Sequence, residues 1–218
     1  MKPLMGAEKP IFTFTGPWGI PVQIGGSILL LPLLFLVLAG SNGLAFSLIF
    51  VGLLIGSIFL HELGHAWGCL VQGVAVKRIM LHGGGGFCEH ARTGTPRADE
   101  LIIAMGPIVN FALWAIASLI GQWAGTGLLG WVLFWTATIN LFLGIFNMLP
   151  VQPLDGGRLL QLVLFRFMPP RRATRIAGGV GLAFALIWYP AAILLFLSVG
   201  LVLFFFPSIR LHLQMLKV

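Results

Sequence analysis

Residues 44–72 read LAFSLIFVGLLIGSIFLHELGHAWGCLVQ, an apolar run that includes His61, Glu62 and His65. Within a bilayer such a run is expected to be a helix, because lipid offers backbone N–H and C=O groups no other partners. A carboxylate deep in a bilayer costs about 2.5–3.5 kcal/mol even on the lenient insertion scale, so it is usually paired, metal-bound or functional. The run therefore predicts a membrane helix with a functional polar cluster.

The whole chain has the composition of an integral membrane protein. Hydrophobic residues make up 58% of its 218 residues and charged residues only 9%, whereas soluble domains average about 25% charged residues. This composition excludes a soluble enzyme, which needs far more charge on its surface. The net charge of +7 is expected to reflect basic residues that flank membrane spans, so the predicted partner is the lipid bilayer and not nucleic acid.

The apolar segments predict an all-α polytopic membrane protein of about six transmembrane helices, organised as a single domain over residues 1–218. No charged residue occurs from Ile176 to Phe206, and one helix of that length would span about 46 Å, well beyond a hydrocarbon core of about 30 Å. A break at Tyr189-Pro190 is therefore expected, with five spans as the alternative. The predicted spans lie near residues 24–40, 44–72, 101–124, 128–149, 173–189 and 191–206.

The basic residues all fall on one side of this arrangement. By the positive-inside rule, both termini and the polar cluster then face the cytoplasm, in a plasma or inner membrane. Between the spans, residues 77–100 are expected to form a loop and residues 156–167 a short interfacial helix. The alternation of side chains in Ile11–Thr15 predicts a short strand.

The polar cluster has the spacing of a metal site. His61 and His65 are four residues apart, so both imidazoles can reach one ion from the same helix face. Glu62 can then face a bound water as general base, and Cys69, one turn further along, is expected to be a core residue rather than a ligand. A catalytic zinc needs a third protein ligand. The topology nominates Asp155, because the second and fourth spans run in the same direction and bring both sites to a similar depth.

Several short motifs accompany this cluster. They are HELGH at 61–65, GPIVN at 106–110, Asn147-x-x-Pro150, and LDG at 154–156. In this combination the chain resembles the site-2 protease family of intramembrane zinc metalloproteases. The resemblance covers about residues 17–165 and includes no PDZ-like or nucleotide-sensing domain, so a compact member of the family is expected.

The resemblance implies a role for each matching residue. His61, His65 and Asp155 would bind Zn²⁺, Glu62 would activate water, and Asn147 would lie near the substrate or the oxyanion. For Asn147 the alternative is a hydrogen bond between helices. The same alternative is favoured for two other asparagines in apolar segments, Asn110 and Asn140.

Four consecutive glycines at 83–86 form a separate feature. The resemblance implies a glycine-rich re-entrant loop beside the active site, with Gly85 and Gly86 in the edge that binds an extended substrate. Glycines permit such close backbone approach, and an added strand would hold the peptide extended. The alternative is a flexible linker between spans.

The expected function is hydrolysis of peptide bonds in or near transmembrane segments of membrane-anchored substrates, as in regulated intramembrane proteolysis. Substrate selection would then rest on the membrane core or on a partner protein. Two alternatives are a metal-ion transporter and a non-proteolytic membrane assembly subunit of the same fold. A Glu62→Gln variant separates them, because a protease should keep zinc and lose cleavage whereas a transporter should keep ion flux.

Overall fold

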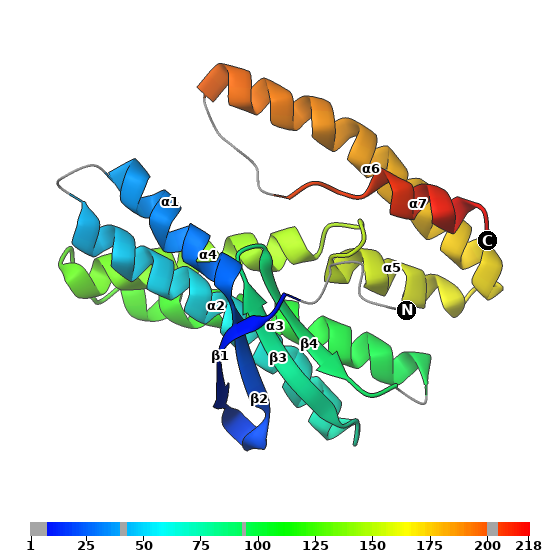
Figure 1. The fold of residues 1–218 in the computed structure, drawn as a ribbon, viewed down its shortest axis with the longest axis horizontal. Helices are drawn as coiled ribbons and strands as arrows, with labels where there is room; N and C mark the ends of the chain where they lie inside the picture. The colour runs from blue at the N-terminus through cyan, green and yellow to red at the C-terminus, as the bar shows by residue number, and fades with distance from the viewer. Residues whose placement is uncertain (1–7, 40–42, 93–94, 200–204) are drawn as a thin grey trace.

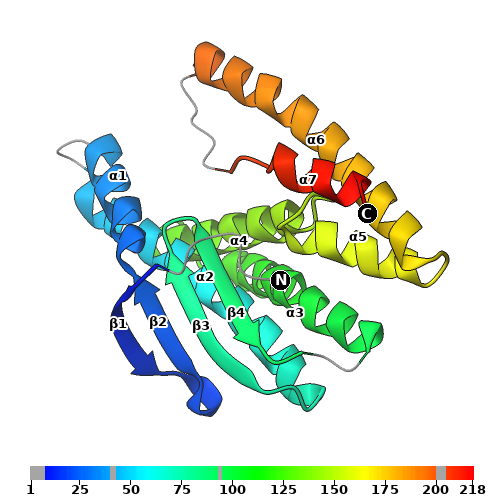
Figure 2. The same cartoon turned by 45° about the vertical axis from the view of Figure 1, so that its right-hand side comes forward.

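The computed structural model of the protein describes residues 8–39, 43–92, 95–199 and 205–218 (Figures 1 and 2). In chain order the elements are β1 (Pro10–Thr15), η1 (Pro17–Gly19), β2 (Pro21–Gly25), η2 (Gly26–Leu29), α1 (Leu30–Ala39), α2 (Leu44–Val71), β3 (Val76–His82), β4 (Gly85–His90), α3 (Pro96–Gly121), α4 (Leu128–Asn147), α5 (Asp155–Phe165), α6 (Pro170–Val199) and α7 (Ile209–Leu216).

A four-stranded sheet in the order β1-β2-β3-β4 lies beside α2 (Figure 2). Strands β1 and β2 pair antiparallel, β2 and β3 parallel, and β3 and β4 antiparallel. The parallel pair needs a crossover, which α1 and α2 provide. The core between sheet and helix contains Val22, Ile79 and Leu81 from the strands and Ala66 from α2.

The sheet corrects the expectation of an all-α fold. The strand predicted at Ile11–Thr15 is confirmed as part of β1. Strand β2, however, lies at the start of the segment assigned to the first span, and β3 and β4 replace most of the loop expected over residues 77–100. These strands are short, and β2 lies about 50 residues from its partner β3 in the sequence, so no single apolar run marks the sheet.

Within the described residues, four helices are long and apolar enough to cross a membrane: α2, α3, α4 and α6. The first predicted span, near residues 24–40, contains the end of β2, then η2 and the ten-residue helix α1. Ten residues of helix rise about 15 Å, roughly half of a hydrocarbon core. Among the described residues there are therefore four candidate spans, where the sequence predicted about six; residues 200–204 of the predicted span near 191–206 lie outside the described residues.

Helix α6 continues through Pro190 for 30 residues, so the predicted break at Tyr189-Pro190 is wrong. A proline removes one helical hydrogen bond, whereas a break within an apolar run would expose several backbone groups to lipid. Residues 205–207 lie beside α6. Trp188 Nε1 donates to the carbonyl oxygen of Phe205 at 2.8 Å, and the Tyr189 hydroxyl donates to that of Pro207 at 3.1 Å.

Helix α7 packs on the first half of α6 (Figure 1). Its Leu211 and Met215 side chains form a buried cluster with Ala177, and Arg175 Nε donates to the carbonyl oxygen of Val218 at 2.8 Å. The C-terminus therefore lies at the same end of α6 as the beginning of that helix.

Candidate metal centre

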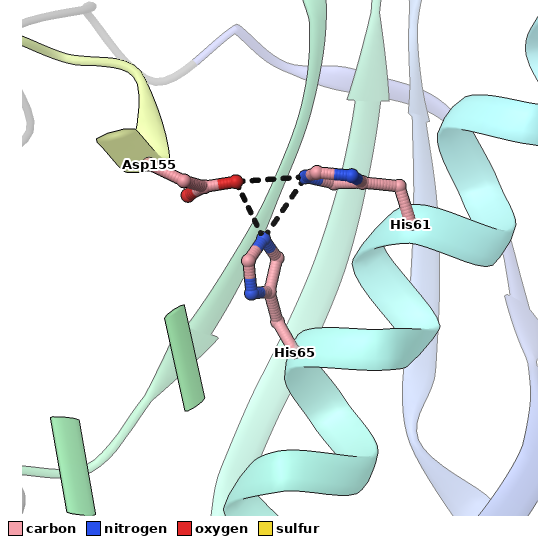
Figure 3. A group of neighbouring side chains, drawn as sticks. All are labelled: His61, His65 and Asp155. Carbon is pink, nitrogen blue, oxygen red and sulfur yellow. Dashed lines mark hydrogen bonds and ion pairs between the residues drawn. The ribbon is translucent and has the colours of Figure 1, made fainter. Parts of the chain in front are cut away.

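The donor atoms of three side chains meet between α2 and the start of α5 (Figure 3). His61 Nε2 lies 3.1 Å from Asp155 Oδ2, and His65 Nε2 lies 3.4 Å from the same oxygen. The two Nε2 atoms are 3.0 Å apart, and all three residues are buried. The structure thus brings together the three ligands that the sequence nominated.

This triangle has the size and chemistry of a zinc site. Three ligands at about 2.0–2.1 Å from a tetrahedral ion lie about 3.3–3.4 Å from one another. Asp155 Oδ2 is buried and forms no hydrogen bond with any described residue, although both imidazoles lie within ion-pair distance of it. A buried carboxylate oxygen in that state is costly unless a cation satisfies it. Two imidazoles and one carboxylate therefore fit Zn²⁺ with a fourth position left for water or substrate.

Each histidine is oriented through its other ring nitrogen. His61 Nδ1 lies 2.6 Å from Asn110 Oδ1, and His65 Nδ1 lies 2.8 Å from the carbonyl oxygen of Ile102. Both partner residues belong to α3. Since oxygen acceptors of this kind cannot donate, each Nδ1 carries the proton, which leaves both Nε2 lone pairs free for a metal ion.

A buried amide chain extends from His61 across three helices. Asn110 Nδ2 donates to Asn140 Oδ1 at 2.8 Å, and Asn140 Nδ2 donates to Ser57 Oγ at 2.9 Å. The chain therefore begins and ends on α2 and passes through α3 and α4. The bonds between helices expected for Asn110 and Asn140 are present, but their role in orienting the ligand His61 was not predicted. The available signal was the position of Asn110 within GPIVN.

Helix α3 lies close to α2 at Gly106, and the absence of a side chain there leaves space for the two imidazoles. A methyl group at Gly106 would lie 2.6 Å from His61 Nε2 and would also collide with the ring of His65. Any side chain at this position would therefore push both ligands out of place. Glycine at 106 is a steric requirement of the site.

Glu62 lies beneath the edge strand of the sheet. It is 5% exposed, and a methyl group at Gly86 on β4 would lie 2.7 Å from its Cγ and 2.9 Å from its Oε1. The glycine-rich stretch is thus a β-hairpin: Gly83 and Gly84 form its turn, while Gly85 and Gly86 begin β4. Gly85 has φ +127°, a conformation that favours glycine.

Asp155 reaches the site at the end of an irregular segment. Helix α4 ends at Asn147 and α5 begins at Asp155, and the segment between them contains Pro150 and Pro153, which cannot donate a backbone hydrogen bond. The helix predicted over residues 156–167 is present, as α5. Arg166 Nε, just after α5, donates to Glu100 Oε1 on α3 at 3.0 Å.

Two other predicted residues lie differently. Asn147 donates from Nδ2 to the carbonyl oxygen of Leu143 at 3.0 Å, and among the described residues its amide has no hydrogen bond with the metal ligands. Cys69 is fully buried in α2 and packs as a core residue, close enough to Cys88 on β4 for a thiol contact. Neither residue contributes a donor atom to the His61–His65–Asp155 group.

Known proteins are similar to this chain in sequence and in fold. A zinc metalloprotease of Methanocaldococcus jannaschii is 32% identical over 171 residues, which are 78% of this chain and 50% of that protein. Stage IV sporulation protein FB of Bacillus subtilis is 33% identical over 138 residues, 60% of this chain and 45% of that protein. The chain therefore spans half or less of the length of these two relatives.

A solved structure of a site-2 protease from Methanocaldococcus jannaschii superposes with a TM-score of 0.69 and 26% identity, and the match covers 94% of this chain and 92% of that one. The sequence profile of peptidase family M50 matches residues 49–129 and 115–188. These segments contain His61, His65 and Asp155. The chain, an integral membrane protein with a group of side chains that can hold zinc, belongs to peptidase family M50, the site-2 protease family.

Proposed function

We propose that this chain is an intramembrane zinc metalloendopeptidase that hydrolyses peptide bonds in or near transmembrane segments of membrane-anchored substrates, in regulated intramembrane proteolysis. One observation carries the proposal. A buried triangle of two imidazoles and an otherwise unpaired carboxylate oxygen lies in an apolar helix bundle, with the Glu62 carboxylate on the same helix.

The residues divide the chemistry among them. His61, His65 and Asp155 would hold Zn²⁺, which when bound supplies a Lewis acid for the scissile carbonyl and acidifies water. Glu62 takes the proton from the attacking water and later delivers it to the leaving amine. Asn147, at the end of α4, would contact the substrate or the oxyanion. The bundle excludes bulk water from these groups.

The substrate is an extended segment bound along β4, where Gly86 adjoins the general base Glu62 and is preceded by Gly85. In the part of the chain that the structure describes, β4 is the last strand of the sheet, so one of its sides has no neighbouring strand. His82 and Gly85 pair directly across the two-residue turn. From that pair onward, an antiparallel ladder alternates between residues that hydrogen-bond to the partner strand and residues whose backbone groups point away from it. Gly86 and Cys88 therefore direct their backbone groups to the free edge, where a peptide unwound from its helix can pair.

The protease domain would comprise residues 1–218, in a plasma or inner membrane with both termini and the metal site facing the cytoplasm. Its partners are the lipid bilayer, a substrate with a transmembrane helix and a protein that selects it. Cytoplasmic activity of a reporter fused after Val218, and of one inserted near Thr95, tests this orientation. A reporter signal from the opposite side at either position would contradict it.

The test of the activity is the purified Glu62→Gln variant. We expect it to bind zinc as the wild type does and to lose cleavage of single-span membrane proteins reconstituted with it, because only the base is removed. Zinc content is measured by metal analysis and cleavage by gel. Retained cleavage by Glu62→Gln would refute the role of Glu62 as general base. Absence of cleavage by the zinc-loaded wild type across a panel of substrates would refute the proposed protease activity.

The substrate edge is tested by the pair Cys88→Pro and Cys88→Ala. Both variants remove the thiol contact with Cys69, but only proline removes an amide donor from the free edge. We expect Cys88→Pro to raise KM several-fold with zinc unchanged, and Cys88→Ala to stay near wild type. Gly86→Val is a weaker test, since its side chain would strike Glu62 directly. Equal KM values for the pair would contradict strand pairing.

A further inference from the structure

A buried histidine outside the His61–His65–Asp155 group contacts the segment that leads to Asp155. His212, on α7, is fully buried. The backbone N–H of Gln152 donates to His212 Nε2 at 3.3 Å, and Gln152 precedes the third ligand by three residues. The last helix of the chain is thereby hydrogen-bonded to the loop that ends in the metal site.

The tautomer of His212 is fixed by its second contact. His212 Nδ1 lies 2.8 Å from the carbonyl oxygen of Ser208, which can only accept, so Nδ1 carries the proton and Nε2 accepts from Gln152. The ring is also held sterically, because a methyl group at Gly181 on α6 would collide with it. These contacts therefore fix both the position of the His212 ring and the nitrogen that carries its proton.

Further hydrogen bonds hold the loop between α4 and α5. Within it, Leu154 N donates to the carbonyl oxygen of Val151 at 3.0 Å, which closes a turn just before α5. The side chain of Gln152 donates to Gln161 Oε1 at 2.8 Å, and Gln161 Nε2 donates to Thr174 Oγ1 at 2.9 Å. The loop is therefore anchored to α5 and α6 by a side chain, and to α7 by its backbone.

We propose that His212 is a positioning residue for Asp155: by accepting the Gln152 N–H, it holds the loop so that the carboxylate completes the metal site. The inference rests on the metal-binding role of Asp155 in the proposed function. The carboxylate must reach two imidazoles that α2 and α3 already hold in place. A small shift of the loop takes Oδ2 out of the triangle, while His61 and His65 keep their own partners.

The matched variants are His212→Asn and His212→Gln. A glutamine side chain is long enough to present an acceptor where Nε2 now lies, whereas asparagine reaches only as far as Nδ1. Met215→Ala, one turn along α7, is the packing control: Met215 contacts Ala177 in the buried cluster and has no bond to the loop. Zinc affinity is measured by chelator competition on full-length protein in detergent, and folding by the thermal unfolding temperature.

We expect His212→Asn to weaken zinc binding about tenfold, the low end for residues outside the ligand set. His212→Gln should recover most of that loss, and Met215→Ala should lower the unfolding temperature while zinc affinity stays near wild type. Wild-type affinity in His212→Asn would overturn the proposal, and so would an equal loss in all three variants, which would indicate packing alone. Because zinc affinity is read without substrate, these outcomes do not depend on whether the chain is a protease.

Discussion

The two sides of the metal triangle are held in different ways. His61 and His65 come from consecutive turns of one helix, and each is oriented directly by a group on α3, Asn110 or the carbonyl of Ile102. Asp155 begins α5 after a loop whose supports come from up to 60 residues later in the chain. The spacing of the two histidines is therefore encoded locally, although their orientation depends on α3, whereas the position of the carboxylate depends on tertiary contacts alone. Loss of the side-chain partner of a histidine should accordingly cost more zinc affinity than loss of a side-chain hydrogen bond that holds the loop.

The largest effect is expected where a ligand itself is lost. His61→Ala, His65→Ala and Asp155→Ala each remove one of three donors, so each should abolish cleavage and reduce bound zinc severely. Metal analysis of the purified variants measures this. Full zinc occupancy in Asp155→Ala would mean that Asp155 is not a zinc ligand. The comparison between the histidine ligands and the carboxylate ligand would then have no basis.

Steric intrusion on the histidine side should come next. The methyl group of Gly106→Ala would lie 2.6 Å from His61 Nε2 and against the His65 ring, so both donors must move and zinc binding should fall by more than about tenfold. Gly52→Ala, on α2, is the control, because a methyl group there meets no described atom within 4 Å beyond its own stretch of helix. Zinc affinity is measured for both variants. Equal affinities would show that α3 yields without disturbing the ligands.

Sequence reasoning reached the histidine side more fully than the rest. The spacing of His61 and His65 specifies their shared face because helix geometry is the same everywhere. Asp155 followed from the direction of the spans and from the resemblance carried by LDG at 154–156, and the amide chain through Asn140 could not be predicted, since it depends on the crossing of three helices. The sheet was largely missed for the same reason: β2 and β3 pair across α1 and α2, and no local pattern encodes a partner that distant.

The C-terminal region was the least predictable. Pro190 suggested a break, yet α6 continues through it, because local preference yields to the cost of exposing backbone in an apolar run. His212 carried no signal in the sequence, and its contact with Gln152 exists only because α7 folds back on α6. Regions that are held by tertiary contacts are those where sequence patterns reveal least.

A smaller effect is expected from removing the direct support of a histidine. Asn110→Ala leaves the Nδ1–H of His61 buried without its acceptor, which costs about 1–3 kcal/mol and frees the ring to rotate. Zinc affinity should fall about tenfold. Ser57→Ala, at the far end of the same chain, is the control and should have little effect, since Asn140 Nδ2 also donates to the carbonyl oxygen of Thr136 at 2.8 Å. Similar losses in both would mean that the chain acts as one unit.

The smallest effect should come from Gln161→Ala, the corresponding change on the carboxylate side. The variant breaks the bonds from Gln152 and to Thr174, but it leaves the Gln152 N–H bonded to His212. Two part-buried neutral hydrogen bonds contribute about 1–3 kcal/mol together, so the unfolding temperature should fall while zinc affinity changes less than in Asn110→Ala. Thermal unfolding and chelator competition on the same samples measure both quantities. If Gln161→Ala weakened zinc binding more than Asn110→Ala does, the side chain of Gln152 would be the main determinant of the position of Asp155. The carboxylate side would then be more sensitive than the histidine side to the loss of a supporting hydrogen bond.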